Sequence, residues 1–431
     1  MISLCKRIFL FSFLVLSFGQ RVESSNNSPY SYYGLGDGKD QPFGYSASMG
    51  GISAALSSPF NLNFYNPASY HTMELTTFET GLSANMRRMF GKDSTQTVGN
   101  IRFSQLVIGF PVSKRMGASF GLIPLSWKDY SSEFTETLPG IGTYTRRLSG
   151  KGGYSQFYIG GGYQITKNIS IGLNVNYLFG AIKDQKITEF PDSSDNYNTR
   201  ESITTTIGDV LLNTGLQYQM KLKEDVKFTI GLSGSISNKI NSIRFKVAER
   251  YEYATSFTTP VTFIQDTVAV NEESRVVEEK GEITLPYRGT LGFNLEKSNK
   301  YLIGLDIGVA QWSKYMYFGQ TGLLQDSWNV AIGGKYIPDY NAVGNYWKRV
   351  SYRAGLKYAK SELLINNIPI TEYGISFGIT LPMIKTRSTI NCGIELSSRG
   401  TKNGGLIKEN MAKLYVGFTL NDKWFVRRKI E

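Results

Sequence analysis

The sequence is poor in the residues that build metal and disulfide sites. It contains one histidine, His71, and two cysteines, Cys5 and Cys392, among its 431 residues. Zinc and related metal sites combine several cysteine and histidine ligands, so sites of that kind are excluded. If the first residues are removed on export, Cys392 is the one thiol left and no intramolecular disulfide can form. We therefore expect neither a metal nor a cofactor.

Long apolar stretches are also missing. The mean hydropathy is −0.22, which is too low for a protein made of several transmembrane helices. The apolar run at residues 8–18 is shorter than the roughly 20 residues that a helix needs to cross a bilayer. This run follows Lys6 and Arg7, and it ends with Ser17-Phe18-Gly19. A basic, then apolar, then small-residue order is typical of a secretory signal peptide, which we place at residues 1–19.

Catalytic motifs and nucleic-acid signatures are absent as well. The sequence has no Gly-x-Ser-x-Gly motif and no P-loop, and the glycine-rich residues 34–38 lack the strand and helix of a phosphate site. The net charge of +12 is not concentrated in a basic helix. Scattered surface lysines and arginines explain it better than nucleic-acid binding does. We expect no enzyme activity and no nucleic-acid partner.

What the sequence has in abundance is alternation with a period of two. In residues 168–180 every second side chain is large and apolar, and small polar residues or glycines lie between. Residues 227–236, 373–381 and 414–421 repeat the pattern. Such alternation predicts long, half-buried strands. Because the polar face is made of small residues, we expect the bulky apolar face to meet lipid, as in a transmembrane barrel.

About fourteen such segments follow one another. They lie at residues 74–90, 100–112, 115–128, 154–166, 168–183, 200–222, 225–243, 284–296, 300–318, 326–338, 348–360, 369–382, 386–399 and 411–421. Connections after even-numbered strands are mostly short, and three connections after odd-numbered strands are long, at 129–153, 184–199 and 244–283. Short periplasmic turns and long extracellular loops are typical of outer-membrane barrels. The prediction is an all-β fold, a transmembrane antiparallel β-barrel of about 14 strands over residues 74–431, in the bacterial outer membrane.

Tryptophans lie near the predicted strand ends. Four of the five, Trp127, Trp312, Trp347 and Trp424, lie at a strand end or just beyond it. In outer-membrane barrels such residues form girdles at the depth of the lipid headgroups. We therefore expect a girdle here, in a barrel surrounded by outer-membrane lipid and lipopolysaccharide.

Residues 20–73 lack the alternation. They are rich in glycine, serine and asparagine, with scattered apolar residues, and residues 49–56 suit one short helix. A segment of this size inside the periplasmic mouth of the barrel would act as a plug. The prediction is a signal peptide (1–19), an N-terminal plug or hatch (20–73) and the barrel (74–431).

Several short motifs follow one another in a specific order. They are Met49-Gly50-Gly51, Asn66-Pro67-Ala68, Leu285-Pro286, Gly292, Asp306 and Trp312-Ser313. Their order resembles the FadL family of outer-membrane transporters, also called the OmpP1/FadL/TodX type, in which an Asn-Pro-Ala box lies in the plug. Residues 28–37 and the closing Lys423-Trp424-Phe425 look like the variety found in Bacteroidetes-type bacteria.

The resemblance implies a fourteen-stranded barrel with an N-terminal hatch that transports hydrophobic compounds such as long-chain fatty acids. The ligand would be captured at the surface and released sideways through a gap caused by a kink in the third strand. The expected ligand or plug residues are Phe64, Tyr65, Asn66, Pro67 and Ala68. The expected lateral-gate residues are Pro124 and Trp127, because a proline cannot donate a ladder hydrogen bond. The alternative is a proline beyond the hydrocarbon zone.

Five charged residues are expected on the lumen face of the strands. They are Asp306, Lys335, Arg353, Lys357 and Glu395. They could anchor the plug, or they could tune ion selectivity as in a porin. We favour anchoring, because a plug argues against an open pore.

The longest predicted loop departs from the family. Residues 244–283 are acidic, with Glu272, Glu273, Glu278, Glu279 and Glu282, whereas a capture groove for fatty acids is apolar. The alternative function is therefore a non-transporting barrel that serves as partner or scaffold in a secretion or surface-attachment complex. It would bind a protein partner at the surface. We expect a monomeric barrel in either case.

Overall fold

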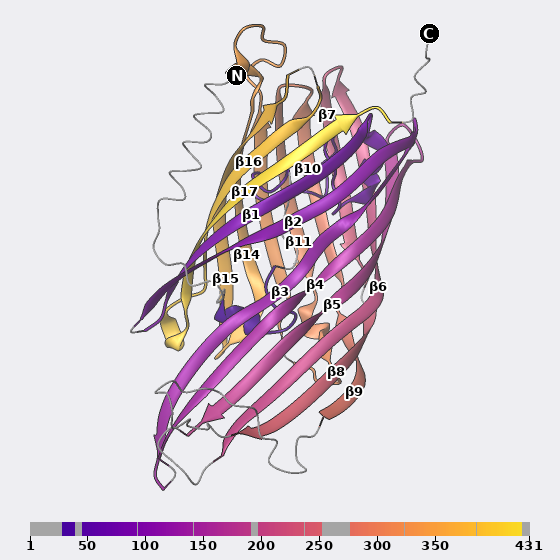
Figure 1. Ribbon diagram of the computed structural model, residues 1–431. Helices are drawn as coiled ribbons and strands as arrows, with labels where there is room; N and C mark the ends of the chain where they lie inside the picture. Colours follow the sequence, from indigo (N-terminus) through magenta and orange to yellow (C-terminus); the bar gives the residue numbers. More distant parts are fainter. Residues whose placement is uncertain are drawn as a thin grey trace, which may run out of the picture.

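The wall of the molecule is one antiparallel sheet that closes on itself. The computed structural model describes residues 28–38, 45–92, 94–140, 142–190, 197–236, 238–251, 276–322, 324–384 and 386–424. The predicted signal peptide lies outside these residues, as do residues 20–27 and 39–44 of the predicted plug. The first strand, β1 (Thr76–Phe90), pairs along its whole length with the last, β17 (Lys408–Asp422), and so closes the barrel (Figure 1).

In the described chain the wall consists of fourteen barrel strands, and three of them are each split into two shorter strands. The remaining strands are β2 (Thr95–Ser113), β3 (Met116–Leu138), β4 (Gly142–Gln164), β5 (Ile169–Glu189), β6 (Asn198–Lys223), β7 (Val226–Ser235) with β8 (Asn238–Tyr251), β9 (Val276–Leu285) with β10 (Arg288–Lys297), β11 (Tyr301–Ala310) with β12 (Met316–Tyr317), β13 (Ser327–Tyr336), β14 (Ser351–Ile365), β15 (Ile368–Pro382) and β16 (Thr389–Arg399). The prediction of an all-β antiparallel barrel of about 14 strands is confirmed.

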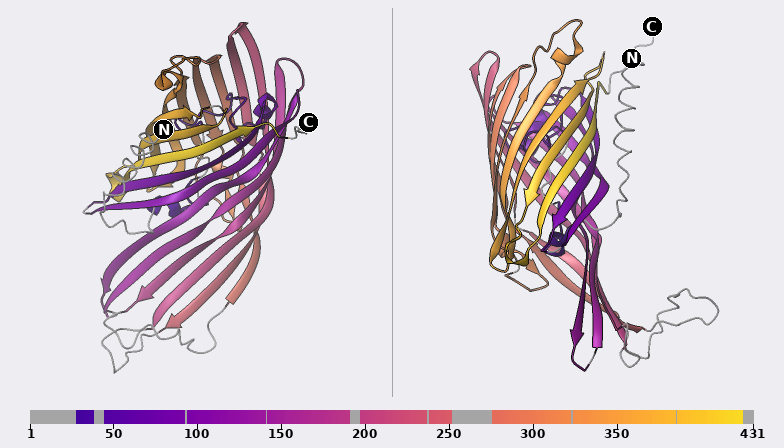
Figure 2. Two further views of the ribbon diagram at one scale, coloured as in Figure 1. Left: turned by 45° about the horizontal axis from the view of Figure 1, so that its top comes forward. Right: turned by 90° about the vertical axis from the view of Figure 1, so that its left-hand side faces the viewer.

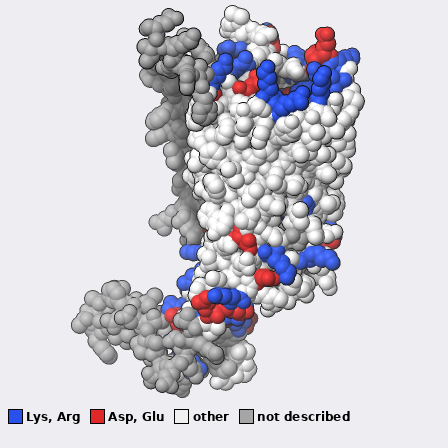
Figure 3. All heavy atoms as spheres, turned by 90° about the vertical axis from the view of Figure 1, so that its right-hand side faces the viewer, with Lys and Arg blue, Asp and Glu red and all other residues white. Residues whose placement is uncertain are grey.

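Side chains alternate across the wall as the sequence predicted. On β5, Ile171, Leu173 and Val175 are exposed on the outside, whereas Asn174 and Asn176 are buried inside. Figure 3 shows the result on one face, where a broad band without charged side chains separates two charged ends. A closed sheet satisfies every strand hydrogen bond without water, and its outer band matches the bilayer core. The protein is therefore an outer-membrane barrel, as predicted.

Helices contribute little to the described fold. No helix among the described residues is long and apolar enough to span a membrane. The short helices are η1 (Pro29–Tyr32), η2 (Pro67–Thr72), η3 (Trp312–Lys314), α2 (Tyr346–Arg349) and η4 (Asn403–Gly405). Two of them, η1 and η2, belong to the chain that precedes the barrel.

The long connections predicted on one side of the barrel are mostly strand. β3 and β4 stay paired out to Leu138 and Gly142, so the predicted connection 129–153 is wrong. The predicted connection 184–199 is also shorter, because β5 and β6 pair out to Thr188 and Thr199. These strands extend beyond the rest of the wall, at the end opposite the C-terminus (Figure 2). The turns at the C-terminal end are mostly short, so this end is periplasmic.

The predicted acidic loop 244–283 also contains strand. Glu278, Glu279 and Glu282 lie on β9, while Glu272 and Glu273 lie outside the described residues. The Glu279 carboxylate lies 2.6 Å from Arg244, and that of Glu282 lies 3.1 Å from Lys239, both on β8. Basic residues on the neighbouring strand therefore neutralise these two glutamates.

The predicted tryptophan girdle is only partly present. Trp347 and Trp424 are exposed at the periplasmic end. Trp312 is only 4% exposed, so the prediction that it faces the membrane interface is wrong. Its ring lies 5.9 Å from that of Tyr315, which is also buried. Trp312 therefore belongs to the core.

Candidate functional site

The barrel wall is incompletely paired between β2 and β3. Their ladder runs from the Ser113–Met116 pair to the Leu106–Leu122 pair and ends there. β2 nevertheless continues back to Thr95, paired with β1, and β3 continues to Leu138, paired with β4. Within the described chain, the two strands form no ladder beyond Leu122, and the side chain of Arg102 on β2 spans the stretch, with its guanidinium 4.2 Å from the centre of the Trp127 ring on β3. We call this unpaired stretch the opening.

Pro124 lies on the β3 edge of this opening. It follows the last paired residue, Leu122, by two positions, and the β3–β4 register shifts between Pro124 and Ser126. Such a shift is typical of a β-bulge, which bends the strand that carries the extra residue. Proline adds to the effect because it has no N–H for a ladder hydrogen bond. These two features explain why β3 turns away from β2 at this position.

Residues 28–38, which we call the strap, lie along the β3 edge of the opening. The N–H of Asp37 donates to the carbonyl of Trp127 at 2.8 Å, and the N–H of Trp127 donates back to Asp37 at 2.9 Å. The N–H of Ser28 donates to the carbonyl of Asp129 at 3.3 Å. The strap thus gives β3 some of the backbone partners that β2 does not supply.

Two glycines allow this close approach. Gly36 and Gly38 flank Asp37 and have φ values of +90° and +92°. A Cβ on Gly36 would lie 2.3 Å from the carbonyl oxygen of Trp127, and a Cβ on Gly38 would lie 2.2 Å from its ring. Only glycine adopts this backbone conformation without strain. The glycine-rich residues 34–38 therefore fit the strap around Trp127.

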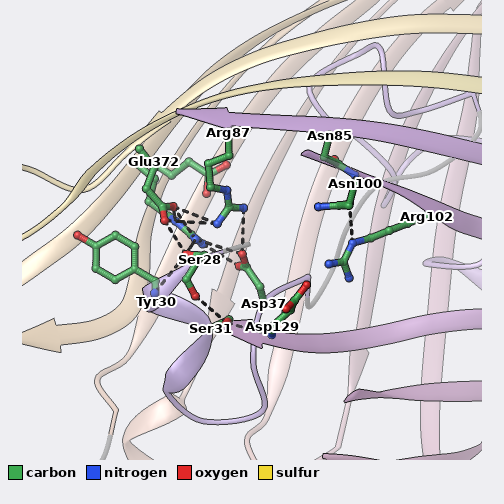
Figure 4. Close-up of polar contacts among 12 residues, drawn as sticks. Ser28, Tyr30, Ser31, Asp37, Asn85, Arg87, Asn100, Arg102, Asp129 and Glu372 are labelled. Atoms are coloured by element: carbon green, nitrogen blue, oxygen red, sulfur yellow. Dashed lines mark hydrogen bonds and ion pairs between the residues drawn. The ribbon is translucent and has the colours of Figure 1, made fainter. Parts of the chain in front are cut away.

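A buried charge cluster holds the other side of the strap (Figure 4). The Asp37 carboxylate lies 2.7 Å from Nη1 of Arg399 and 3.1 Å from Nη2 of Arg87. The Glu409 carboxylate lies 2.8 Å from Arg399 and 3.2 Å from Arg87. The hydroxyl of Ser28 donates to Glu409 at 2.6 Å and accepts from Arg399 at 2.9 Å. We call Asp37, Arg87, Arg399 and Glu409 the latch cluster; it joins the strap to β1, β16 and β17.

The latch cluster is electrically balanced, with two carboxylates and two guanidinium groups. Burial alone would raise the pKa of Asp37, but Arg399 and Arg87 hold it well below its ordinary range. Removing one partner of such a cluster leaves a buried charge uncompensated, which is strongly destabilising. The cluster therefore fixes the strap as long as all four groups are present.

A second part of the N-terminal chain, residues 45–73, lies inside the barrel (Figure 1). We call it the inner segment. Asn66 is fully buried, and its side-chain oxygen accepts from the N–H of Ala68 at the start of η2. Its side-chain nitrogen donates to the carbonyls of Ala54 at 2.5 Å and Leu216 at 3.3 Å. Asparagine is a favoured N-cap, and proline, here Pro67, suits the first helical position.

The small residues on the lumen face make room for the inner segment. A Cβ on Gly172 would lie 2.2 Å from the carbonyl carbon of Pro67, and one on Gly333 would lie 2.1 Å from the carbonyl oxygen of Met49. The polar face of each strand is therefore small because the inner segment packs directly on it.

The expected ligand or plug residues lie together at one point of the inner segment. The Phe64 ring packs edge-to-face on Tyr158, with centroids 4.7 Å apart, and the Tyr65 ring lies 5.4 Å from that of Phe64. Phe64, Asn66, Pro67 and Ala68 are buried, and Tyr65 is half-buried. Of the five, only Tyr65 lines the lumen cavity described below.

Three of the five expected lumen charges contact the inner segment. The Asp306 carboxylate accepts from the N–H groups of Ser53 at 2.6 Å and Ala54 at 2.9 Å. Nη1 of Arg353 donates to the carbonyl of Tyr45 at 2.7 Å. Nζ of Lys335 lies 5.6 Å from the centre of the Tyr45 ring.

The other two expected charges pair within the wall. Nζ of Lys357 lies 2.6 Å from Glu395 and 2.8 Å from Glu372. The lumen between the strap and the inner segment holds a cavity of about 340 Å³, which these three residues line together with Arg399 and Lys413. Sites for apolar ligands are lined mostly by apolar side chains. This cavity is instead strongly polar on one side, while Tyr30, Tyr33 and Trp312 contribute aromatic surface.

The strap and the latch cluster were missed by sequence reasoning. Arg87, Arg399 and Glu409 come from three strands that are adjacent only in the closed barrel. The one available signal was the glycine pair around Asp37, which indicates a tight backbone approach but no partner.

Comparisons with known proteins agree with the fold. The model of the BamG family matches residues 1–431. The structure of the toluene transporter TodX from Pseudomonas putida is 16% identical, with a TM-score of 0.51, over 89% of this chain and 99% of that chain. The structure of the toluene transporter TbuX from Ralstonia pickettii is 13% identical, with a TM-score of 0.52, over 88% of this chain and 98% of that chain. The structure of a FadL homologue from Pseudomonas aeruginosa is 11% identical, with a TM-score of 0.55, over 90% of this chain and 98% of that chain. No curated protein matches the chain.

Proposed function

The chain belongs to the BamG family, and from its FadL-type barrel we propose that it transports hydrophobic small molecules across the outer membrane. The class we infer is long-chain, fatty-acid-like compounds. The observation that carries the proposal is the opening between β2 and β3 beyond the Leu106–Leu122 pair. An opening in the wall joins the lumen to the membrane, where an apolar molecule is more stable than in water.

In this proposal the inner segment is the plug, and residues 20–73 as a whole are the hatch. The contacts of Asp306 and Arg353 with the inner segment support this role. The strap then covers the opening until a ligand displaces it, and Pro124 and Trp127 form the gate edge. The related structures named for toluene transport share the fold, which supports the substrate class only by analogy.

Replacing Pro124 with alanine is expected to reduce uptake several-fold without unfolding the barrel. Alanine restores the N–H that the ladder lacks, so β3 can pair with β2 further along and narrow the opening. Uptake of a fluorescent fatty acid into cells measures the effect, and heat-modifiable gel migration verifies that the barrel is folded. The matched control is Pro111→Ala on β2, where the strands are paired. Equal uptake by wild type and Pro124→Ala would contradict lateral release.

The second candidate is a partner or scaffold barrel. Two observations favour it: ionised residues line the lumen cavity, and the matching family model is named BamG rather than after a transporter. Native mass spectrometry of the protein, extracted gently from its own outer membrane, separates the two functions. A co-purified apolar molecule that added fatty acid displaces is expected for a transporter. A stoichiometric protein partner with no small molecule would overturn transport in favour of the scaffold.

A further inference from the structure

Basic side chains collect at the periplasmic end of the barrel. All the described turns there except the one between β6 and β7 carry at least one, namely Lys114, Arg115, Lys167, Lys300, Lys348, Arg349 and Arg387, and Lys221, Lys223 and Lys297 lie at the adjoining strand ends. In Figure 3 lysine and arginine side chains dominate the upper rim, which is this end. Acidic residues are fewer at this end, with Glu224, Asp225 and Asp339 in the turns and Glu296 and Asp422 at strand ends. Part of the net charge of +12 therefore faces the inner leaflet of the outer membrane.

One groove on this rim adjoins the lipid-facing wall. It has a volume of about 1010 Å³ and lies where β1 and β17 close the barrel, beside the turn between β15 and β16. Its lining includes the apolar side chains Leu75, Phe78, Leu420, Met383 and Trp424, the basic side chains Arg349, Arg387 and Lys423, and Tyr340. Leu420 and Trp424 are 47% and 54% exposed, so the apolar side is open to lipid.

The groove is built on fixed elements. The hydroxyl of Tyr346 donates to the carbonyl of Pro382 at 3.0 Å, which ties α2 to the end of β15. The N–H of Asp339 donates to the carbonyl of Lys348 at 2.8 Å and closes the connection between β13 and β14. This connection is the one long turn at the periplasmic end, and it places Arg349 at the groove.

The two arginines of the groove contact aromatic residues and not carboxylates. Nη1 of Arg387 donates to the Tyr340 hydroxyl at 2.9 Å, and its guanidinium lies 5.1 Å from the centre of the Phe60 ring. The Arg349 guanidinium lies 5.5 Å from the centre of the Tyr346 ring. Neither arginine forms an ion pair with an acidic residue of the described chain.

The lining also contains one acidic residue, Asp422, whose carboxylate accepts the backbone N–H of Lys423 at 2.7 Å. With Arg349, Arg387 and Lys423 against one carboxylate, the groove keeps a net positive charge.

We propose that this groove binds one anionic phospholipid of the inner leaflet, with its phosphate on Arg349 and Arg387 and its acyl chains along Phe78 and Leu420. Guanidinium groups bind phosphate through paired, charge-assisted hydrogen bonds. Tyrosine and tryptophan are favoured at the depth of the headgroups. An acidic protein in the periplasm would meet the same cations, but it would leave the lipid-facing wall of the groove unused. This proposal does not rest on the transport function, since its test measures lipid retention and not uptake; Arg387 also contacts Phe60 of the inner segment.

The full mature chain, reconstituted in nanodiscs of phosphatidylethanolamine and phosphatidylglycerol and then released gently, tests the proposal by native mass spectrometry. Wild type is expected to retain one phosphatidylglycerol. The double variant Arg349→Gln/Arg387→Gln should bind it at least about tenfold more weakly, because one cation near an anionic lipid is worth roughly fivefold in affinity. The matched control is Lys114→Gln/Arg115→Gln, a basic pair on the same rim outside the groove. It should retain phosphatidylglycerol as wild type does.

Three outcomes would contradict the proposal that the groove binds a phospholipid. The first is that Arg349→Gln/Arg387→Gln, the groove variant, retains phosphatidylglycerol as wild type does. The second is that the groove variant and the control variant lose phosphatidylglycerol equally, which indicates a general effect of the rim charge. The third is loss of a co-purified protein from the groove variant while phosphatidylglycerol stays bound. Heat-modifiable migration of both variants verifies that they are folded.

Discussion

In the Asp37→Ala variant, chymotrypsin is expected to cleave after Tyr32 or Tyr33 roughly a hundredfold faster than in wild type. The reason lies in the latch cluster, where Arg87 and Arg399 share the carboxylates of Asp37 and Glu409. Removing one partner of a buried ion pair costs about 3–5 kcal/mol, because a charge is left uncompensated. Cleavage of a transiently opened segment follows the population of the open form. Mass spectrometry of the fragments measures the rate.

The control for this variant is Asp225→Ala. It removes a carboxylate that lies 3.1 Å from Lys297 at the periplasmic rim, where the two side chains are 51% and 41% exposed. An exposed pair of this kind contributes about 0–1 kcal/mol, so the cleavage rate should stay that of wild type. Gly38→Ala tests the same strap without any change of charge, since a Cβ there collides with the Trp127 ring. If Asp37→Ala and Gly38→Ala both resist cleavage, neither the latch cluster nor the fit around Trp127 holds the strap.

The sequence predicted the strands well within the membrane and poorly beyond it. On β5, alternation placed a strand at residues 168–183, and the strand is Ile169–Glu189. Alternation records a lipid-facing side and a lumen side, so it fades where both faces of the sheet meet water. The outer part of β6 has Thr204, Thr205 and Thr206 in a row, and its only apolar residues before Gly208 are Ile203 and Ile207, too few for a clear alternation. Such residues form strand because neighbouring strands continue the ladder, which a single segment cannot reveal.

The candidate site also has parts that the sequence could predict and parts that it could not. Asn66-Pro67-Ala68 could be recognised because a cap and its helix are local in the sequence, and the structure places Asn66 at the start of η2. The latch cluster could not, because the β1–β17 and β16–β17 registers bring Arg87, Glu409 and Arg399 together across the closure of the barrel. The opening between β2 and β3 is a stretch in which these two strands are not paired. Pro124 hinted at where it begins, and nothing in the sequence indicated that the strap lies along it.

A variant that lacks residues 45–73 is expected to conduct ions in planar bilayers, with a current at least about tenfold above that of wild type. The inner segment packs on Gly172 and Gly333 of the lumen face, so its removal empties the centre of the barrel. The wall itself does not need the segment, since β1 closes on β17 through strand residues alone. The remaining lumen is lined by small polar and charged side chains, which admit water and ions.

Because the deletion could prevent folding, the point variant Asp306→Leu provides a second measurement. It leaves the N–H groups of Ser53 and Ala54 without their acceptor. Each unsatisfied buried donor costs about 1–3 kcal/mol, so the inner segment should leave its place part of the time and produce brief openings. Asp225→Leu is the matched control, because it makes the same change at an exposed carboxylate that pairs with Lys297 at the periplasmic rim and forms no described contact with the segment. Closed channels in both the deletion and Asp306→Leu, with heat-modifiable migration intact, would mean that something other than the inner segment blocks the lumen.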